Sequence, residues 1–176
     1  RKPSKPFSLN LRIPDWCRKY TIKVNGQATE VKFAPGQYAD IHRSWKEGDV
    51  LTLEMEMPIR LMETHPLVEE TRNQVAVKRG PVVYCLESAD QPRDVNIFNI
   101  ILPAKNDLKP KKQAIENSSM TVLEGTGYVR KEPGSATALY REVNTDVKPV
   151  PIKLIPYYAW ANRGMGNMTV WMLLGR

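Results

Sequence analysis

The sequence predicts an all-β chain that forms two antiparallel, jelly-roll-like β-sandwich units, and three observations support this. Apolar and polar residues alternate with a period of two along most of the chain, whereas a helical period of 3.6 is almost absent. Turn pairs such as Asn-Gly and Pro-Gly separate the alternating runs at short intervals. About ten short strands with regular turn chemistry are typical of antiparallel sandwiches.

The runs in the first third of the chain each predict a strand. Residues 7–13 alternate until a Pro-Asp pair, and residues 20–24 alternate until Asn25-Gly26. Because Asn-Gly tolerates the positive φ of a tight hairpin, we expect residues 20–24 to fold back on residues 31–33. Further strands are predicted at 38–45 and at 51–57, where the alternation is most regular.

Gly80-Pro81 interrupts strand-like sequence that runs from Val75 to Glu87. Glycine permits a bulge or a sharp bend, and proline removes a backbone donor. The sheet is therefore expected to end, to kink or to change partner at this point. The preceding residues 59–73 are mixed and charged, and they predict no strand.

The remaining signals are weaker. Residues 97–102, 121–123, 127–129, 150–158 and 168–174 read as strands, and 161–166 read as a loop. Residues 105–119 read as a long loop with a helical turn near 113–116. Composition changes near 86–92 and 161–166 suggest that the middle of the chain packs separately. We therefore expect residues 87–165 to form a unit of their own.

Composition favours a soluble chain. With 176 residues, of which 41% are hydrophobic, the chain can bury a substantial core, and no run reaches the ~20 apolar residues of a membrane span. The net charge is +7, with one local cluster at Lys105, Lys109, Lys111 and Lys112. No nucleic-acid motif accompanies these lysines, so a solvated loop is favoured over a nucleic-acid site. The start RKPSKPF lacks an initiator Met, which indicates a piece of a larger protein.

The residues that usually carry catalysis are sparse. Cys17 and Cys85 lack metal-ligand spacing and are expected to be free thiols, and His42 and His65 have no ligand partner at a suitable spacing. Acidic residues such as Glu54 and Glu56 occupy outward strand positions, where a solvated face explains them. We predict no catalytic residue, no metal ligand and no cofactor in this chain.

Aromatic residues are the remaining candidates for a functional surface. Trp45, Tyr157, Tyr158 and Trp160 could stack on sugar rings. The alternative is that they fill the core or close a sheet end, as tryptophan often does in a β-sandwich. Both interpretations stay open from the sequence.

Several strings together resemble one family. The chain is similar to the C-terminal region of bacterial glycoside hydrolases of the β-L-arabinofuranosidase family (glycoside hydrolase family 127), formerly a domain of unknown function. The resemblance covers nearly the whole chain except about residues 90–149, and it is carried by LRIPDWC, YTIKVNG, YADIHRSWKEGDVLTLEMEMPIR, HPLVEETRNQVAVKRGPVVYCLE and IPYYAWANRGMGNMTVWM.

The resemblance implies a specific architecture. In that family an (α/α)6 barrel carries the active site and two β-sandwich domains follow it, the last strand returning to the first sandwich. For this chain the resemblance implies a first sandwich from residues 1–86 and 166–176, and a second from residues 87–165. Gly80-Pro81 would then lie where the chain passes between the two. The family's cysteine nucleophile, zinc ligands and glutamate acid/base belong to the barrel and match no residue here, so any zinc is expected in the missing catalytic domain.

We therefore expect a non-catalytic β-sandwich region that braces a missing barrel. Two alternatives remain: a carbohydrate-binding module that uses the four aromatic residues, and a structural or adhesive sandwich unrelated to sugars. Expected partners are the barrel, a carbohydrate, and a second copy bound through an exposed sheet edge, with no nucleic acid and no membrane. The compartment, cytoplasmic or periplasmic, stays open.

Overall fold

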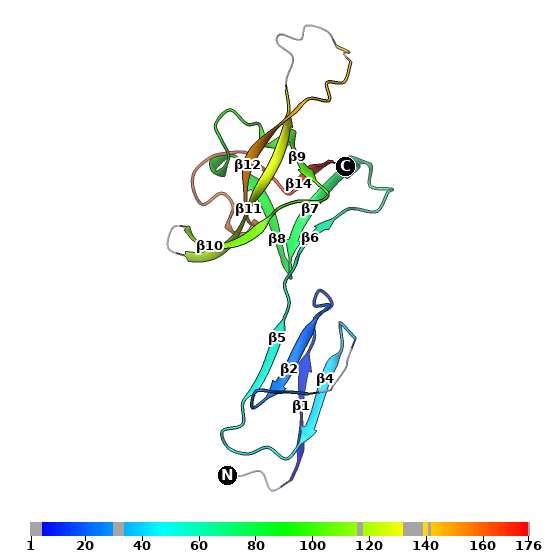
Figure 1. Cartoon of the computed structure of the whole chain (residues 1–176), viewed down its shortest axis with the longest axis vertical. Helices are drawn as coiled ribbons and strands as arrows, with labels where there is room; N and C mark the ends of the chain where they lie inside the picture. The colour runs from blue at the N-terminus through cyan, green and yellow to red at the C-terminus, as the bar shows by residue number, and fades with distance from the viewer. Residues whose placement is uncertain (1–4, 30–33, 116–117, 132–138, 141, 176) are drawn as a thin grey trace. The chain divides into compact units, whose positions relative to one another are not determined.

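The computed structural model describes residues 5–29, 34–115, 118–131, 139–140 and 142–175, and these residues confirm the all-β class (Figure 1). The described residues form strands and four short 3-10 helices, and no α-helix. Two compact units make up the chain, Arg1–Pro58 (unit 1) and Ile59–Arg176 (unit 2). Each unit has its own sheets and its own buried cluster, so each is described by itself.

Unit 1 contains two small sheets. In the first, β1 pairs antiparallel with β4, and in the second β2 lies between β3 and β5. The predicted turn is present, because Asn25 and Gly26 have φ angles of 51° and 80°. The strands are β1 (Phe7–Arg12), β2 (Tyr20–Val24), β3 (Gln27–Ala28), β4 (Tyr38–Arg43) and β5 (Leu51–Met55). The expected partner at 31–33 lies outside the described residues, and β3 pairs with β2 directly after the turn.

The two sheets of unit 1 share one apolar cluster. Its buried members come from both sheets and from the connection after β1: Ile13, Cys17, Ile22, Ala39 and Ile41. Alternate residues of β4 are buried, as the period of two predicts. The predicted core-facing alternation is therefore present in β2 and β4, whereas no residue of β1 or β5 is fully buried.

Unit 2 is built around a closed barrel. Six of its strands pair in a ring, in the order β7, β8, β12, β11, β9 and β14, and β14 returns to β7. Its elements are β6 (Ile59–Met62), η1 (Glu69–Thr71), β7 (Gln74–Arg79), β8 (Val82–Glu87), η2 (Ser88–Asp90), η3 (Ile97–Asn99), β9 (Ile100–Pro103), β10 (Lys109–Ile115), β11 (Ser118–Arg130), β12 (Val147–Pro156), η4 (Tyr157–Ala159), β13 (Met168–Thr169) and β14 (Trp171–Gly175). The β9–β14 pair is parallel.

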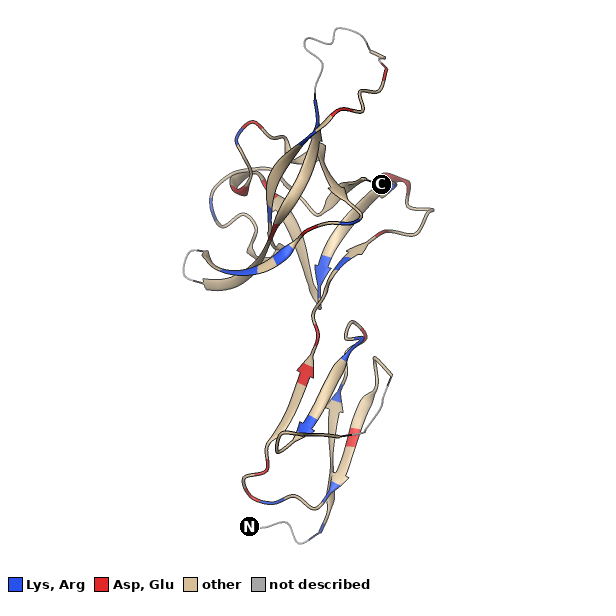
Figure 2. Cartoon of the chain, in the orientation of Figure 1, with Lys and Arg blue, Asp and Glu red and all other residues tan. Residues whose placement is uncertain are grey.

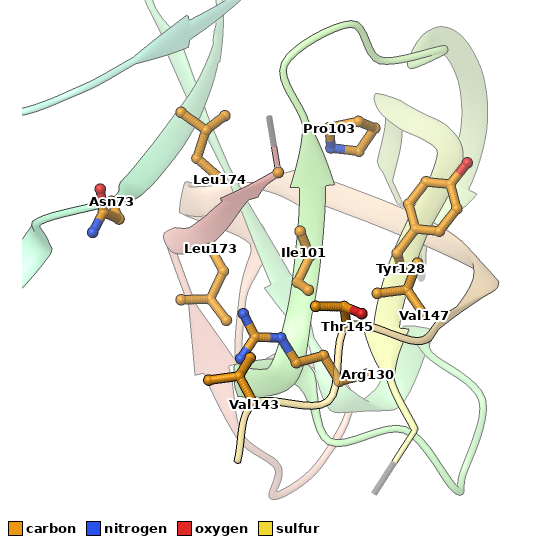
Figure 3. A pocket seen from close by; sticks show the side chains of 11 residues that line it. Asn73, Ile101, Pro103, Tyr128, Arg130, Val143, Thr145, Val147, Leu173 and Leu174 are labelled. Carbon is orange, nitrogen blue, oxygen red and sulfur yellow. The ribbon is translucent and has the colours of Figure 1, made fainter.

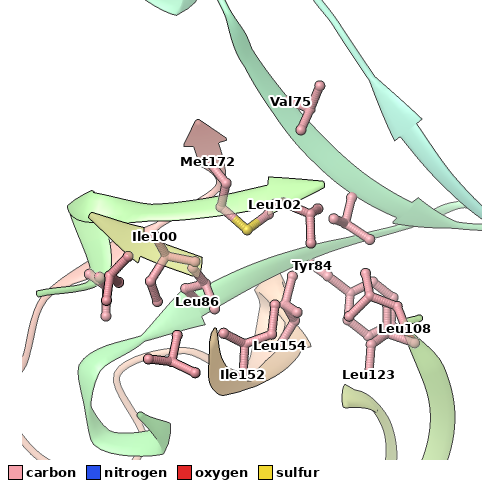
Figure 4. Packing of buried hydrophobic residues seen from close by; sticks show 14 residues of the cluster. Val75, Tyr84, Leu86, Ile100, Leu102, Leu108, Leu123, Ile152, Leu154 and Met172 are labelled. Atoms are coloured by element: carbon pink, nitrogen blue, oxygen red, sulfur yellow. The ribbon is translucent and has the colours of Figure 1, made fainter. Parts of the chain in front are cut away.

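The barrel encloses the main apolar cluster of unit 2 (Figure 4). Leu86, Ile100, Leu123 and Leu154 are completely buried. A Cβ atom at Gly127 of β11 would lie 2.9 Å from Ile152 Cγ2, so glycine is needed for strand and core to approach this closely. The interior is a packed core.

The division of the chain differs from the expected one. The boundary falls between Pro58 and Ile59, and not between residues 86 and 87, because β6, β7 and β8 pair within unit 2. The final strand pairs with β7 and β9, so it closes unit 2 and does not return to unit 1. Unit 2 also closes into a barrel, which differs from the two stacked layers expected of a sandwich.

Gly80-Pro81 is a hairpin turn, and the expected crossing between units is wrong. Arg79 pairs with Val82 across it, and Val77 pairs with Tyr84 further along the same hairpin. Gly80 has a φ of 58°, the sign that a two-residue II′ turn requires at its first central position. Proline follows without loss because its fixed φ suits the second central position.

Three local predictions in unit 2 are also wrong. Residues 109–115, expected as a loop with a helical turn, form strand β10, and 118–130 form one long strand where two short ones were expected. β6 lies in a stretch from which no strand was predicted. Most side chains of β10 are exposed, so the strand has no buried apolar period to reveal it; pairing with β11 defines it.

Candidate functional site

Three of the four predicted aromatic residues lie together on one loop of unit 2. This segment, residues Tyr157–Asn167, is called the aromatic loop here. Tyr157, Tyr158 and Trp160 are 45%, 70% and 40% exposed. The ring centroids of Tyr157 and Trp160 are 6.4 Å apart and their planes differ by 28°, so the two rings are nearly parallel. The loop therefore presents two nearly parallel, partly exposed aromatic rings.

The local sequence explains how this loop starts. β12 ends at Pro156, and η4 then turns the chain, with the Trp160 N–H donating to the Tyr157 carbonyl at 3.3 Å. Ala159 is buried, whereas its aromatic neighbours project outward. Ala161 has a φ of 63°, a left-handed conformation that is uncommon for a residue with a Cβ atom. The aromatic pair thus sits on a tightly turned backbone.

A group of four charged residues, Glu87, Asp90, Lys153 and Arg163, holds the aromatic loop; it is called the charge network here. Arg163 donates from Nη1 and Nη2 to the two carboxylate oxygens of Asp90, at 2.7 and 2.5 Å, and from Nη2 to Glu87 Oε2. Lys153 Nζ lies 2.5 Å from Asp90 Oδ1. The side chains of Glu87 and Asp90 are only 3% and 2% exposed.

The electrostatics of the network keep the Asp90 carboxylate charged. Burial alone would raise the pKa of Asp90, but hydrogen bonds from Arg163 and Lys153 outweigh it and hold that pKa below its usual value. The hydrogen bond to Asp90 likewise raises the pKa of Arg163. Two acids and two bases compensate one another, so the network is a paired structural unit and offers no free base or nucleophile.

Sequence reasoning missed this network. One signal was present: Glu87 ends the buried run of β8. Because a buried carboxylate is normally paired, this position predicts a cationic partner. The partner could not be found from spacing, since Arg163 lies 76 residues further along the chain.

Trp45 occupies a different environment, in unit 1. Its indole Nε1 donates to the Phe7 carbonyl at 3.1 Å, and its ring centroid lies 6.0 Å from that of Phe7. The Arg43 guanidinium lies 5.1 Å from the ring centroid on one face. Trp45 is half-buried and packs against the apolar cluster of its unit. These contacts are those of a tryptophan that packs at the end of a sheet, which is the alternative to a sugar-stacking role.

A groove of about 730 Å³ opens on unit 2 at β9, β11 and β14 (Figure 3). Ile101, Leu173 and Val143 provide apolar walls, and the Arg130 side chain extends between them. Val143 is 72% exposed. Arg130 forms no ion pair with another described residue. Such an open, largely apolar surface is suited to contact with another protein surface.

The cysteines and histidines make only structural contacts. Cys17 and Cys85 are buried free thiols, as predicted. Ser8 Oγ and His42 Nδ1 are 3.0 Å apart, and His65 Nδ1 accepts from the Leu67 N–H at 3.3 Å. Across the described ranges no three metal-ligating side chains come together. None of the helices in those ranges has the length and apolar character needed to cross a bilayer.

The predicted lysine cluster lies mostly on β10, where Figure 2 shows basic residues along the strand. Lys111 pairs with Glu124 of β11 at 2.9 Å. β10 is bonded to β11 on one side, and none of the described strands pairs with its other side. Lysines on such an edge oppose the addition of a further strand. The position of the lysines on this edge is therefore consistent with a role in preventing a further strand from pairing with β10.

Together these features define an all-β region with packed units and surface aromatic residues, and no group of metal-ligating side chains among the described residues. The chain belongs to glycoside hydrolase family 127: the family's C-terminal domain matches residues 59–173, and the family's β-L-arabinofuranosidase middle domain matches residues 1–57.

Individual relatives agree. A non-reducing end β-L-arabinofuranosidase of Bifidobacterium longum subsp. longum is 31% identical over 170 residues, which cover 92% of this chain and 25% of that protein. A solved glycoside hydrolase matches with 51% identity and a TM-score of 0.91, over 98% of this chain and 28% of its own. A family 127 β-L-arabinofuranosidase from Geobacillus stearothermophilus T6 matches with 35% identity and a TM-score of 0.88, over 97% and 27%. The chain thus spans about a quarter of these relatives.

Proposed function

We propose that this chain is the non-catalytic β region of a larger β-L-arabinofuranosidase and that it braces a helical catalytic barrel. The observation that carries the proposal is the position of the matches. The two matched domains meet between residues 57 and 59, where the structure also divides, and together they fill only about a quarter of the relatives' length. These positions support the assignment of the chain to the β domains of a longer enzyme.

The internal architecture is part of this proposal. Unit 1, with two sheets around one cluster, is proposed to be a small β-sandwich. The groove at Ile101, Val143 and Leu173 is proposed as a contact face for the catalytic barrel, because apolar burial between domains is what a bracing role requires. Arg130 would then pair with an acidic group of the barrel.

Two measurements test the bracing role. The purified chain is expected to show no turnover of aryl arabinofuranosides, and reproducible turnover would overturn the non-catalytic assignment. In a complete family 127 enzyme that carries this chain, Val143→Glu is expected to lower the melting temperature of the catalytic domain while leaving the isolated chain unchanged, since Val143 is largely exposed there. An equal effect in both contexts would count against a contact face.

A second function is favoured by the aromatic loop. We propose that Tyr157 and Trp160 bind a carbohydrate by stacking, because both rings are nearly parallel and each is partly open to solvent. Tyr158, more exposed than either, is proposed as a lateral contact. Trp45 is a weaker candidate, because Arg43 and Phe7 already occupy its surroundings.

Affinity gel electrophoresis tests the carbohydrate proposal. Gels that contain arabinan or arabinogalactan should retard the chain, and Trp160→Ala should abolish the retardation. Tyr38→Ala removes a tyrosine that is 59% exposed in unit 1 and serves as the matched control. Migration that does not depend on the polysaccharide would leave bracing as the only proposed role.

A further inference from the structure

We infer that the charge network is a positioning device, which fixes the aromatic loop so that Tyr157 and Trp160 are held ready for an uncharged saccharide. This inference rests on the carbohydrate function proposed above. Glu87, Asp90, Lys153 and Arg163 are assigned as positioning residues: Glu87 and Asp90 bind the loop residues Ala161 and Arg163, and Lys153 binds Asp90.

The loop is fastened on both sides of the aromatic residues. Glu87 Oε1 accepts from the Ala161 N–H at 3.0 Å, immediately after Trp160, while Glu87 Oε2 accepts from Arg163. Lys153 lies on β12, four residues before Tyr157, and contacts Asp90 at 2.5 Å. The chain entering the loop and the chain leaving the aromatic pair are thereby joined to one segment, 87–90.

The far end of the loop is held to the same segment. Ser88 N–H donates to the Asn167 carbonyl at 2.9 Å, and the Asn167 N–H donates to Ser88 Oγ at 3.0 Å. Gly166 packs against this contact, because a Cβ atom there would lie 2.6 Å from Ser88 Oγ. Residues 87–90 therefore act as a common base for the whole loop.

The energetics of buried ion pairs indicate that the network fixes the geometry of the loop more than it adds stability. A buried ion pair is seldom more stabilising than apolar groups of the same volume, because desolvation offsets the attraction. Apolar packing would hold the loop without the specific directions that a bidentate arginine imposes. The left-handed Ala161 is an additional unfavourable conformation beside Trp160, and such conformations persist only where the surroundings impose them.

Preorganisation gives this geometry a functional consequence. A loop that is already ordered loses less conformational entropy when it binds, so affinity rises without new contacts. The network's charges are also mutually paired, and both carboxylates are buried. The surface beside the rings therefore attracts no ion strongly, which suits an uncharged sugar better than an acidic one.

The test compares Arg163→Lys and Glu87→Gln with the unmodified chain. Arg163→Lys keeps the charge but loses the bidentate geometry, and Glu87→Gln keeps an acceptor for Ala161. Hydrogen exchange followed by mass spectrometry should show lost protection in residues 157–167, with β11 and β12 peptides unchanged. Arabinan affinity should fall about 10-fold, because ordering of the loop must then accompany binding. Arg72→Lys, which alters the surface pair with Glu69, is the control and should change neither readout.

The carbohydrate function and the positioning role of the network can be overturned separately. If Trp160→Ala keeps full affinity, the carbohydrate function is wrong. If Trp160→Ala abolishes binding while folded Arg163→Lys and Glu87→Gln bind normally, the function stands and the positioning role is overturned. If the unmodified chain is not retarded, the exchange measurement still decides whether the network orders the loop, and unchanged protection in both variants overturns it. If Arg163→Lys does not fold, the exchange protection and arabinan affinity of Glu87→Gln alone test the positioning role.

Discussion

Arg163 and Asp90 form an end-on ion pair in which each terminal guanidinium nitrogen faces one carboxylate oxygen, at 2.7 and 2.5 Å. The two residues are 73 positions apart in sequence. Because the pair is bidentate, it sets the direction of the arginine as well as its distance. It is thus a rigid link between the aromatic loop and the 3-10 turn that follows β8.

Acid should weaken unit 2 through Asp90. The pKa of Asp90 is depressed in the folded protein, so its contribution to stability is fully present above the unfolded value of about 4 and is lost as pH falls through the folded pKa. At neutral pH, Asp90→Asn should lower the free energy of unfolding by about 3 kcal/mol, because it breaks a buried carboxylate's pairs with two partly buried cations. Urea titrations from pH 7 to pH 2 should show this difference narrowing below about pH 4. The exposed Asp146→Asn, which alters a 4.0 Å surface pair, should change stability by less than about 0.5 kcal/mol.

Gly80 should be intolerant of a side chain. Its φ of 58° disfavours a residue with a Cβ atom, so Gly80→Ala should lower the free energy of unfolding by about 1 kcal/mol. Gly80→Asn should cost less, since asparagine enters this region more readily. Thermal denaturation of the two variants checks that Gly80→Ala is the less stable. Equal melting temperatures for Gly80→Ala and the unmodified chain would contradict the assigned turn.

Gly127 should be intolerant for a different reason, namely packing. A Cβ atom there would meet Ile152 Cγ2 at 2.9 Å and Ile100 Cγ2 at 3.0 Å. Gly127→Ala should therefore cost about 1 to 3 kcal/mol through overpacking. Ile152→Ala removes Cγ2, so if the clash is the cause the double variant should lose less stability than the sum of the two single losses. Additive losses in the double variant would exclude that explanation.

Neither thiol should react in the folded chain. Burial, assisted by nearby Glu87 and Asp90, raises the pKa of Cys85 to about 12. Cys17 is completely buried as well, and its Sγ donates to the Lys19 carbonyl at 3.2 Å. A chromogenic disulfide reagent at pH 8 should detect no thiol in the native chain and both after denaturation. Rapid reaction of one thiol before unfolding would show that its unit opens locally.

The lysines of β10 should keep its free edge from pairing. Lys109 and Lys112 are both exposed on this edge strand. Replacing both with valine should raise the average mass measured by light scattering at high concentration. Lys105→Val, a change of equal chemistry outside β10, should leave the mass unchanged. If it has the same effect, lost net charge and not edge protection is responsible.

Periodicity revealed the strands that have one buried face. β1, β2, β4 and β5 were predicted to within a few residues, because alternate positions meet the core and the others meet water. β10 and β6 escaped detection for the opposite reason. β10 is largely exposed and β6 is partly exposed throughout, so their pairing partners define them, and a partner is not visible in local sequence.

Only the aromatic residues of the candidate site could be identified from the sequence; the charge network could not. The local run Tyr157-Tyr158-Ala159-Trp160 already marked an aromatic cluster, since its members are adjacent in the chain, but its exposure was decided by the structure. The acidic and basic residues that hold it come from β8, η2, β12 and the loop itself. No spacing rule joins residues so far apart.

The sequence alone determined the all-β class, the turns at Asn25-Gly26 and 161–166, the free thiols and the family, because each depends on neighbouring residues or on whole matched strings. Only the tertiary structure decided where the units divide, that the final strand closes the second unit's barrel, and which charges meet at the aromatic loop. Gly80-Pro81 illustrates the reason. A positive φ followed by proline specifies a sharp turn, but whether that turn joins two strands of one sheet or passes to another depends on contacts between residues distant in the chain.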